Sequence, residues 1–311
     1  MKRLVFAAIV AASSTATTAQ DTTQKGAEVM AQVRQALGGD KLAQLKTLSL
    51  EGPFAREMGQ RQVKGTLVLT MQLPDHMHRS EDIEMMGGVS IERTSVLAGT
   101  SSWEDMQNRG GVGGGMQIVM RQGPPGQELN AEQIEEARLR RFRNEFNRYL
   151  LAFTGGANLQ AAYVAVAEAP EGKADVLEIK NETGQAVRLF VDQQTHLPLM
   201  LQYMEVRPRF NMIGGPGGRG GPPPPSGGGA PAAGAPDGQR QSPEEMRRRI
   251  ESMPPPAPSQ VTLYLADFKK VDGIMLPHRL TQAVEGKPVE EWTLEKVKVN
   301  PSVKAELFEK K

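Results

Sequence analysis

The histidines His76 and His78 form the grouping with the clearest chemical potential in this chain. They lie two residues apart on an expected strand, so both imidazoles would share one face, and the carboxylates of Glu81 and Asp82 follow closely. Imidazole and carboxylate groups bind zinc, but two ligands do not make a site, and no HExxH motif or third-ligand spacing accompanies the pair. The pattern favours surface histidines over a zinc site, and the sequence predicts no metal and no cofactor.

Other catalytic patterns are missing from the sequence. The chain has no Cys, which excludes a cysteine nucleophile, a thiolate metal site and disulfide bonds. No Ser occupies a GxSxG setting, and the glycine runs lack the GK[ST] motif of a phosphate-binding loop. His196 and His278 each lie near a proline at an expected strand edge, where they would form local hydrogen bonds. The sequence therefore predicts no catalytic residue and no enzyme, and a hydrolase is the least supported hypothesis.

The composition argues against partners held by bulk charge. The 311 residues carry a net charge of +1, and 39% are hydrophobic but only 5% aromatic. Such a balance gives no electrostatic attraction to nucleic acid or to an anionic membrane. The elements Arg109-Gly110-Gly111 and Arg219-Gly220-Gly221 resemble RNA-binding RGG motifs, yet in a neutral chain they favour solvated loops. We expect no nucleic-acid partner.

Residues 1–19 have the organisation of a secretory signal peptide. A basic start, Met1-Lys2-Arg3, precedes an apolar run over residues 4–12 and the small residues Thr17-Thr18-Ala19. The apolar run is far shorter than the roughly 20 residues that a membrane span needs. Because no Cys is available for lipid modification, we expect a soluble, exported, periplasmic protein that does not span the membrane after cleavage.

Two stretches have the period of a helix. Residues 24–37 place apolar side chains on one stripe, and residues 130–153 form the stronger pattern, with Asn130 and Gln133 spaced as a capping box. Arg138, Arg141 and Arg148 fall towards the side opposite the apolar stripe. The apolar stripe of this second helix consists of Ile134, Leu139, Phe142, Phe146, Tyr149, Leu150 and Phe153.

Most other segments alternate with the period of two that is typical of strands. Asp272-Gly273 between two such runs predicts a hairpin, because glycine accepts the positive φ of a primed turn. The expected strands are residues 46–51, 65–73, 76–86, 89–98, 99–104, 162–168, 175–180, 186–191, 197–206, 261–271, 274–280 and 289–299.

These patterns predict a mainly β fold of the α+β type. About eleven antiparallel strands are too many for a flat sheet, so we expect a single curled antiparallel sheet forming an unclosed barrel capped by helices. Flexible Gly/Pro-rich insertions interrupt it at about residues 106–128 and 207–259. The strands after the second insertion are too few for a core of their own, so the strands at residues 197–206 and 261–271 should pair within one domain, residues 20–311.

Short motifs lie along this order of parts. They are Ala36-Leu37-Gly38-Gly39, Leu48-Ser49-Leu50-Glu51-Gly52, residues 74–79, residues 99–103, Leu189-Phe190-Val191-Asp192, Thr195-His196-Leu197-Pro198, residues 268–279, Val299-Asn300-Pro301 and Leu307-Phe308. With these motifs the chain resembles the LolA/LolB-like superfamily of periplasmic lipoprotein carriers. The resemblance spans nearly the whole mature chain and implies an unclosed barrel with an apolar cavity for acyl chains and no catalysis.

The candidate ligand-binding site is the apolar interior of this barrel. A Leu- and Met-rich face is either packed core or the lining of a cavity, and the sequence leaves both open; sixteen Met residues and few aromatic ones favour an adaptable cavity. An acyl chain of about twelve methylenes would gain on the order of 10 kcal/mol on burial, before ordering costs. The expected lining is Leu67, Leu69, Met71, Leu199, Leu201, Tyr203, Val261, Leu263 and Leu265, with Phe142, Phe146 and Leu150 on a helical lid.

The leading hypothesis is a carrier or binder of lipid acyl chains or lipidated protein. The helix at residues 130–153 would be a lid, and residues 110–126 its hinge. The alternative is a structural or interaction module of the cell envelope with a packed barrel, whose Gly/Pro-rich insertion binds a protein partner.

Overall fold

The computed structural model describes residues 19–59, 61–85, 88–109, 130–156, 159–169, 172–206 and 257–310. Its helices are α1 (Ala19–Leu37), α2 (Asp40–Ala43), α3 (Ala131–Thr154) and the 3-10 helix η1 (Ala305–Leu307). The strands of its first half are β1 (Thr47–Met58), β2 (Arg61–Gln72), β3 (His76–Glu84), β4 (Ser90–Ala98) and β5 (Ser101–Arg109). Those of its second half are β6 (Ala161–Ala169), β7 (Gly172–Lys180), β8 (Ala186–Asp192), β9 (Pro198–Glu205), β10 (Ser259–Val271), β11 (Ile274–Val284), β12 (Lys287–Thr293) and β13 (Lys296–Val299).

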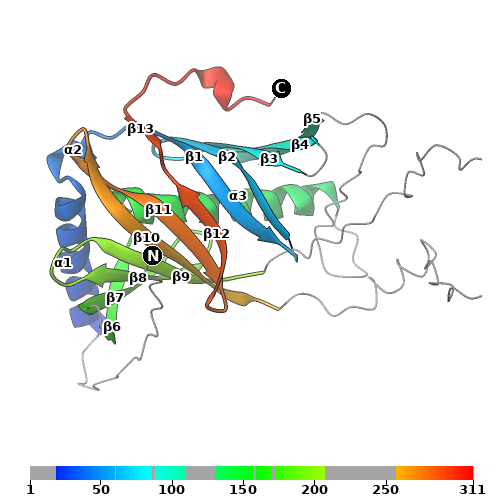
Figure 1. Cartoon of the computed structure of the whole chain (residues 1–311). Helices are drawn as coiled ribbons and strands as arrows, with labels where there is room; N and C mark the ends of the chain where they lie inside the picture. Colours follow the sequence, from blue (N-terminus) through cyan, green and yellow to red (C-terminus); the bar gives the residue numbers. More distant parts are fainter. Residues whose placement is uncertain are drawn as a thin grey trace, which may run out of the picture.

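All of these strands form one antiparallel sheet that is not closed. The order is β5-β4-β3-β2-β1-β12-β11-β10-β9-β8-β7-β6, and β13 pairs with β1 outside this path. Figure 1 shows the sheet curling around α3, with α1 standing upright beside β6 at one end. The prediction of a curled, unclosed and mainly β fold is confirmed, although the sheet has 13 strands rather than about eleven.

The hairpin of β10 and β11 forms as the sequence predicts. Val271 pairs with Ile274, and both turn residues have positive φ, 49° at Asp272 and 89° at Gly273, as a type I′ turn requires. β10 also pairs with β9 along Leu263 and Leu201, so the two strands flanking the second insertion are neighbours. The expected pairing across that insertion is confirmed.

Strand β1 is longer than its sequence pattern indicates. The pattern ends at Glu51, whereas the strand continues through Gly52 and Pro53 to Met58. Up to Glu51 the strand pairs with β13, and from Phe54 it pairs with β12, so Pro53 occupies the gap between two partners. A proline without an N–H group is tolerated there, since that ladder has no bond for it to donate.

The carboxy-terminal strand is correspondingly divided. The sequence predicts one strand over residues 289–299, but the structure has β12 and β13, with the backbone N–H groups of Leu294 and Glu295 bonded elsewhere in the sheet. The short helix η1 follows β13. β5 reaches Arg109, which shortens the first predicted insertion.

Helix α3 begins with the predicted capping box and ends at a glycine. The side chain of Asn130 accepts from the backbone N–H of Gln133, and the Gln133 side chain accepts from the backbone N–H of Asn130. Gly155 closes the helix with φ 66°. The signal peptide, the hinge at residues 110–126 and most of the second insertion lie outside the described residues.

Candidate ligand-binding site

The concave side of the sheet brings nearly all the predicted lining residues together. In the main core, nine of the predicted side chains are at most 6% exposed, while Leu150 and Leu263 are partly buried against it. The nine are Leu67, Leu69, Met71, Phe142, Phe146, Leu201, Tyr203, Val261 and Leu265.

Leu199 does not join this group. The register of β8 and β9 shifts at this point, with Phe190 opposite Met200 and Val191 opposite Pro198, so Leu199 is the extra residue of a β-bulge. Its side chain packs against a second small cluster on the convex face, which includes Phe190 and Met200. A bulge interrupts the period of two, which is why the sequence pattern placed Leu199 on the concave face.

The interior is tightly packed around the inner strands. Leu67, Leu69, Leu201 and Val261 have no exposed surface, and Phe142 has 1%. A side chain lining an empty space wide enough for water would retain accessible surface, so these groups contact protein atoms on all sides. A ligand that reached them would have to displace a covering element, and α3 supplies Phe142 and Phe146 to that cover.

Charged side chains cross the concave face, and we call them the concave ionic cluster. Six come from the sheet and two from α3, and each forms at least one ion pair with a member of opposite charge. The cluster consists of Arg56 of β1, Arg79 and Glu81 of β3, Arg93 of β4, Glu104 of β5, Glu290 of β12, and Arg141 and Glu145 of α3.

Glu81 is the centre of this cluster. Its side chain is 2% exposed and forms ion pairs with Arg56 and, at 2.5 Å, with Nη2 of Arg79; Nη1 of Arg93 lies 3.8 Å away. Arg56 in turn binds Glu290 at 2.7 Å. A carboxylate buried this deeply is tolerated only because it is surrounded by guanidinium groups.

The same arrangement sets the protonation of the buried carboxyl groups. Burial alone would raise the pKa of Glu81, but the charges of Arg79 and Arg56 outweigh it and hold the pKa at about 2. Burial also acts to raise the pKa of Glu104, but the charges of Arg93 and Arg141 outweigh it and lower this pKa below the ordinary value. Both groups are therefore ionised at neutral pH.

Much of the contact between α3 and the sheet is polar. Arg141 binds Glu104 at 2.7 Å, and Glu145 binds Nη1 of Arg79 at 2.9 Å and accepts from the Tyr149 hydroxyl at 3.3 Å. Near the carboxyl end, Arg148 lies over the Tyr203 ring at 4.3 Å.

The predicted orientation of Arg138, Arg141 and Arg148 is wrong, because all three face the sheet. Arg141 binds Glu104, and Nε of Arg138 donates to the Ser102 hydroxyl at 3.4 Å, both on β5. The Arg148 side chain is only 9% exposed and pairs with Glu205 at 3.3 Å. Together with the stacking on Tyr203, the pair with Glu205 pins the second half of α3.

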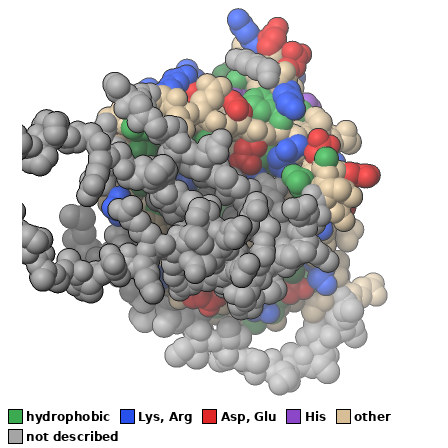
Figure 2. All heavy atoms as spheres, turned by 90° about the vertical axis from the view of Figure 1, so that its right-hand side faces the viewer, with side chains coloured by type: hydrophobic (Ala, Val, Ile, Leu, Met, Phe, Trp, Pro, Cys, Tyr) green, Lys and Arg blue, Asp and Glu red, His purple; other side chains and the backbone are tan. Residues whose placement is uncertain are grey.

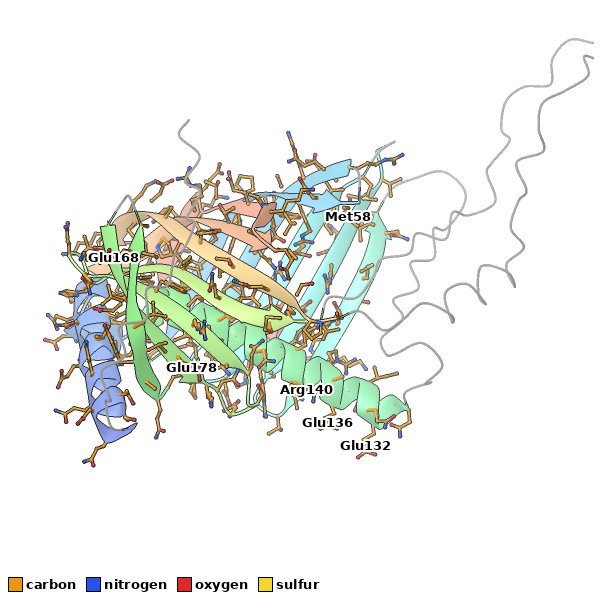
Figure 3. All side chains as sticks on the ribbon, turned by 90° about the horizontal axis from the view of Figure 1, so that it is seen from below. Met58, Glu132, Glu136, Arg140, Glu168 and Glu178 are labelled. Carbon is orange, nitrogen blue, oxygen red and sulfur yellow. The ribbon has the colours of Figure 1, made fainter. Side chains whose placement is uncertain are left out.

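The amino-terminal part of α3 is much less embedded. None of its residues from Ala131 to Leu139 is buried, and Figure 3 shows Glu132, Glu136 and Arg140 pointing away from the sheet. Deep burial of α3 begins at Phe142 and continues to Thr154. The helix is thus anchored by its second half and by ion pairs.

Sequence reasoning missed the concave ionic cluster, although one signal was present. On β3, Met77, Arg79, Glu81 and Ile83 alternate with the period of two, and both apolar members belong to the main core. Because every second side chain of a strand lies on the same face, the charged residues between Met77 and Ile83 in this series had to face the interior as well.

His76 and His278 form local contacts, whereas the predicted side-chain hydrogen bond of His196 is absent at its buried Nδ1, which has no partner. Nδ1 of His76 lies 2.8 Å from Asp75, and its ring meets Phe308 edge-on; Nδ1 of His278 lies 2.9 Å from the Leu276 carbonyl oxygen. Across the described ranges, no group of three or more His, Cys, Asp or Glu residues stands close enough to hold a metal ion.

A groove of about 900 Å³ lies outside the concave site. It runs between the β4–β5 turn, the first turns of α3 and the carboxy-terminal segment, and Trp103 and Phe308 contribute its aromatic wall. The indole N–H of Trp103 donates to the Phe308 carbonyl oxygen at 3.2 Å, which fixes that wall. Figure 2 shows basic, acidic and hydrophobic side chains intermixed on the visible described surface at one end of the molecule.

The fold and the concave site define an open antiparallel half-barrel covered by a helix. No family model and no curated protein matches the chain. The chain is similar to a domain assigned to outer membrane lipoprotein sorting from Vibrio parahaemolyticus, at 10% identity and a TM-score of 0.45 over 92% of this chain and 97% of that one. A LolA superfamily protein from Nitrosomonas europaea is 11% identical, with a TM-score of 0.43 over 92% of this chain and 98% of that one. A DUF1329 family protein from Desulfovibrio piger is 9% identical, with a TM-score of 0.44 over 93% of this chain and 97% of that one. The superfamily that the sequence resembles is among these matches.

In the part of the chain that the structure describes, no helix is both long and apolar enough to cross a membrane.

Proposed function

We propose that the chain is an exported, periplasmic carrier or binder of lipid acyl chains or lipidated protein, and that it acts without catalysis. The observation that carries this proposal is the way α3 covers the apolar concave face. Its side chains Phe142 and Phe146 are buried, but its bonds to β3 and β5 include ion pairs. These charged groups bind water once they are exposed, so displacing α3 uncovers less apolar surface than displacing a helix held by apolar contacts alone.

The direction of that movement follows from where α3 is attached. Its carboxyl end is embedded through Leu151 and Phe153 and stops at Gly155 and Gly156, both with positive φ. Its amino-terminal turns lack buried residues. Displacement starting at the amino-terminal end would uncover Leu67, Leu69 and their neighbours.

Locking α3 to the sheet tests this function. The Asn144 side chain accepts from the Thr183 hydroxyl at 2.5 Å, and the chain has no Cys, so Asn144→Cys with Thr183→Cys gives a unique pair for a short thiol crosslinker. We expect the uncrosslinked variant to bind a fluorescent fatty acid and the crosslinked one to bind at least about tenfold more weakly, because ligand binds only the open state. Titration by fluorescence measures both.

The control is each single-Cys variant treated with the same reagent, which should bind as the untreated protein does. Native mass spectrometry of the gently purified chain should also detect co-purified lipid. Equal binding by the locked and unlocked forms would contradict the role of α3 as a lid, and a chain that carries no lipid and ignores fatty acids would contradict the carrier itself.

A second candidate function, an envelope interaction module, is favoured by the groove at Trp103 and Phe308. A concave site of this volume, with fixed aromatic side chains, is suited to a protein segment. A photo-crosslinking residue at the exposed Thr100, which lines the groove, should then yield an adduct of one discrete added mass in cells. The same residue at Glu168, on β6 far along the sheet order, should yield none; identical products at both positions would contradict this function.

A further inference from the structure

One hydrogen-bond donor of the concave ionic cluster has no acceptor. Among the described residues, the buried side-chain atoms without a partner are Nε of Arg79, Nδ1 of His196 and Nε1 of Trp292, and of these only Arg79 belongs to the cluster. Its other two nitrogens are used, Nη1 for Glu145 at 2.9 Å and Nη2 for Glu81 at 2.5 Å. A buried donor left unpaired costs free energy, which makes it a marker of a group that is absent in this state.

Displacement of α3 would free a second donor on the same guanidinium. Glu145 is the carboxylate that α3 supplies to Arg79, so it leaves with the helix. Glu81 remains but is shared with Arg56 and Arg93, and Glu290 lies 3.8 Å from Arg79. In the open state Nε and Nη1 of Arg79 would both lack an acceptor from the protein.

Apolar side chains flank this position on the concave face. Leu69 is directly opposite Arg79 on β2, and Met77 lies two residues away on β3 and pairs with Leu97. All three are at most 1% exposed and belong to the main core. An open site at Arg79 would therefore combine a cationic point with an apolar surface running along the strands.

The balance of charge restricts what could bind there. The sheet residues of the cluster are Arg56, Arg79, Arg93, Glu81, Glu104 and Glu290, which are equal in positive and negative charge. When α3 is in place, it adds one charge of each sign, Arg141 against Glu104 and Glu145 against Arg79. A ligand that substitutes for the Glu145 carboxylate should carry negative charge and oxygen acceptors.

We propose that Arg79 is the head-group site for an anionic amphiphile, a carboxylate or a phosphate monoanion whose oxygens take the place of the Glu145 carboxylate. The apolar chain would then lie along Leu69 and Met77. This inference rests on the proposed carrier function and adds its ligand class. A cationic head group is disfavoured at the same point, because it would meet the unpaired donor.

Chain-matched ligands on three proteins test the proposal. Dodecanoate, dodecyl phosphate and dodecanol are titrated by displacement of a fluorescent probe into the unaltered chain, Arg79→Gln and Glu145→Gln. We expect Arg79→Gln to weaken both anions about tenfold or more and to leave dodecanol within about twofold, since charge-assisted hydrogen bonds are lost only with the anions. Glu145→Gln removes the competing carboxylate and should tighten the anions relative to dodecanol.

Glu145→Gln keeps the proposal testable if Arg79→Gln fails to fold. Arg140→Gln and Glu136→Gln change the same charges on the outer side of α3, as Figure 3 shows, and should leave the ratio of anion to alcohol binding unchanged. A mere loosening of the lid would change all ligands by one factor, which would overturn the head-group site but leave the carrier intact. If none of the ligands binds the unaltered chain, the carrier function and this inference are both contradicted. If the anions bind, comparing the affinities for dodecanoate and dodecyl phosphate shows which anion is preferred.

Discussion

Glu81→Gln should lower the free energy of unfolding by about 3–5 kcal/mol at neutral pH, the range for removing one partner of a buried ion pair. The reason is that Glu81, 2% exposed, is the carboxylate on which Arg56, Arg79 and Arg93 converge, and the variant would leave them under-compensated. Denaturation in urea measures the change. The variant keeps the shape of the side chain, so lost packing does not contribute.

The pH dependence of this effect has a defined sign. The pKa of Glu81 is about 2 in the folded chain and 4.5 as its ordinary value, so the unfolded chain binds the proton more tightly. The stabilisation is fully present above pH 4.5, about 3 kcal/mol from the two pKa values, and is lost as the pH falls towards 2. The difference between the unaltered chain and Glu81→Gln should accordingly shrink over that interval.

Glu51→Gln is the matched control. Glu51 also pairs with a basic residue, Lys296 at 2.5 Å, but their side chains are 36% and 63% exposed. An exposed pair contributes little to stability, because solvent screens it. Equal destabilisation by the two substitutions would show that the concave ionic cluster behaves like a surface pair and does not hold the sheet.

The sequence predicted the sheet because its strands obey simple local rules. The turn at Asp272-Gly273 and the alternation along β2 depend only on neighbouring residues, and both appear in the structure. The concave ionic cluster instead depends on which strands become neighbours. Arg56 and Glu290 are far apart in the chain and meet only because β1 pairs with β12.

The candidate site was accordingly predicted in its apolar part and missed in its polar part. Period two places Leu67, Leu69 and Met71 inside without any knowledge of topology. The same rule was not applied to Arg79 and Glu81, because charged residues are normally assigned to solvent. The position of Leu199 depends on a β-bulge, and the orientation of Arg148 depends on an ion pair with a residue of another element. A single sequence reveals neither.

The junction of β1, β12 and β13 includes a close backbone approach, and Gly52→Ala should disrupt it. A Cβ atom at Gly52 would lie 1.8 Å from the carbonyl oxygen of Thr293, which is backbone and cannot rotate away. Since Gly52 occupies the point where β1 exchanges β13 for β12, the strands would have to separate there. We expect a loss of about 3 kcal/mol in the free energy of unfolding, at the upper end for overpacking.

Gly286→Ala separates this steric effect from the general consequence of replacing a glycine. Gly286 has φ 76° in the β11–β12 turn, and a Cβ there would meet nothing within 4 Å, so only the left-handed backbone is penalised, by about 1–2 kcal/mol. Urea denaturation of both variants should rank Gly52→Ala as the more damaging. Trp292 and Leu294 flank Thr293 and are each 3% exposed in the main core. In the folded state, a soluble quencher should therefore reduce the tryptophan fluorescence of Gly52→Ala more than that of the unaltered chain. Gly286→Ala should show no such increase in quenching. A Gly52→Ala protein with unchanged stability and fluorescence would mean that the junction of β1, β12 and β13 can open without affecting the concave site beneath it.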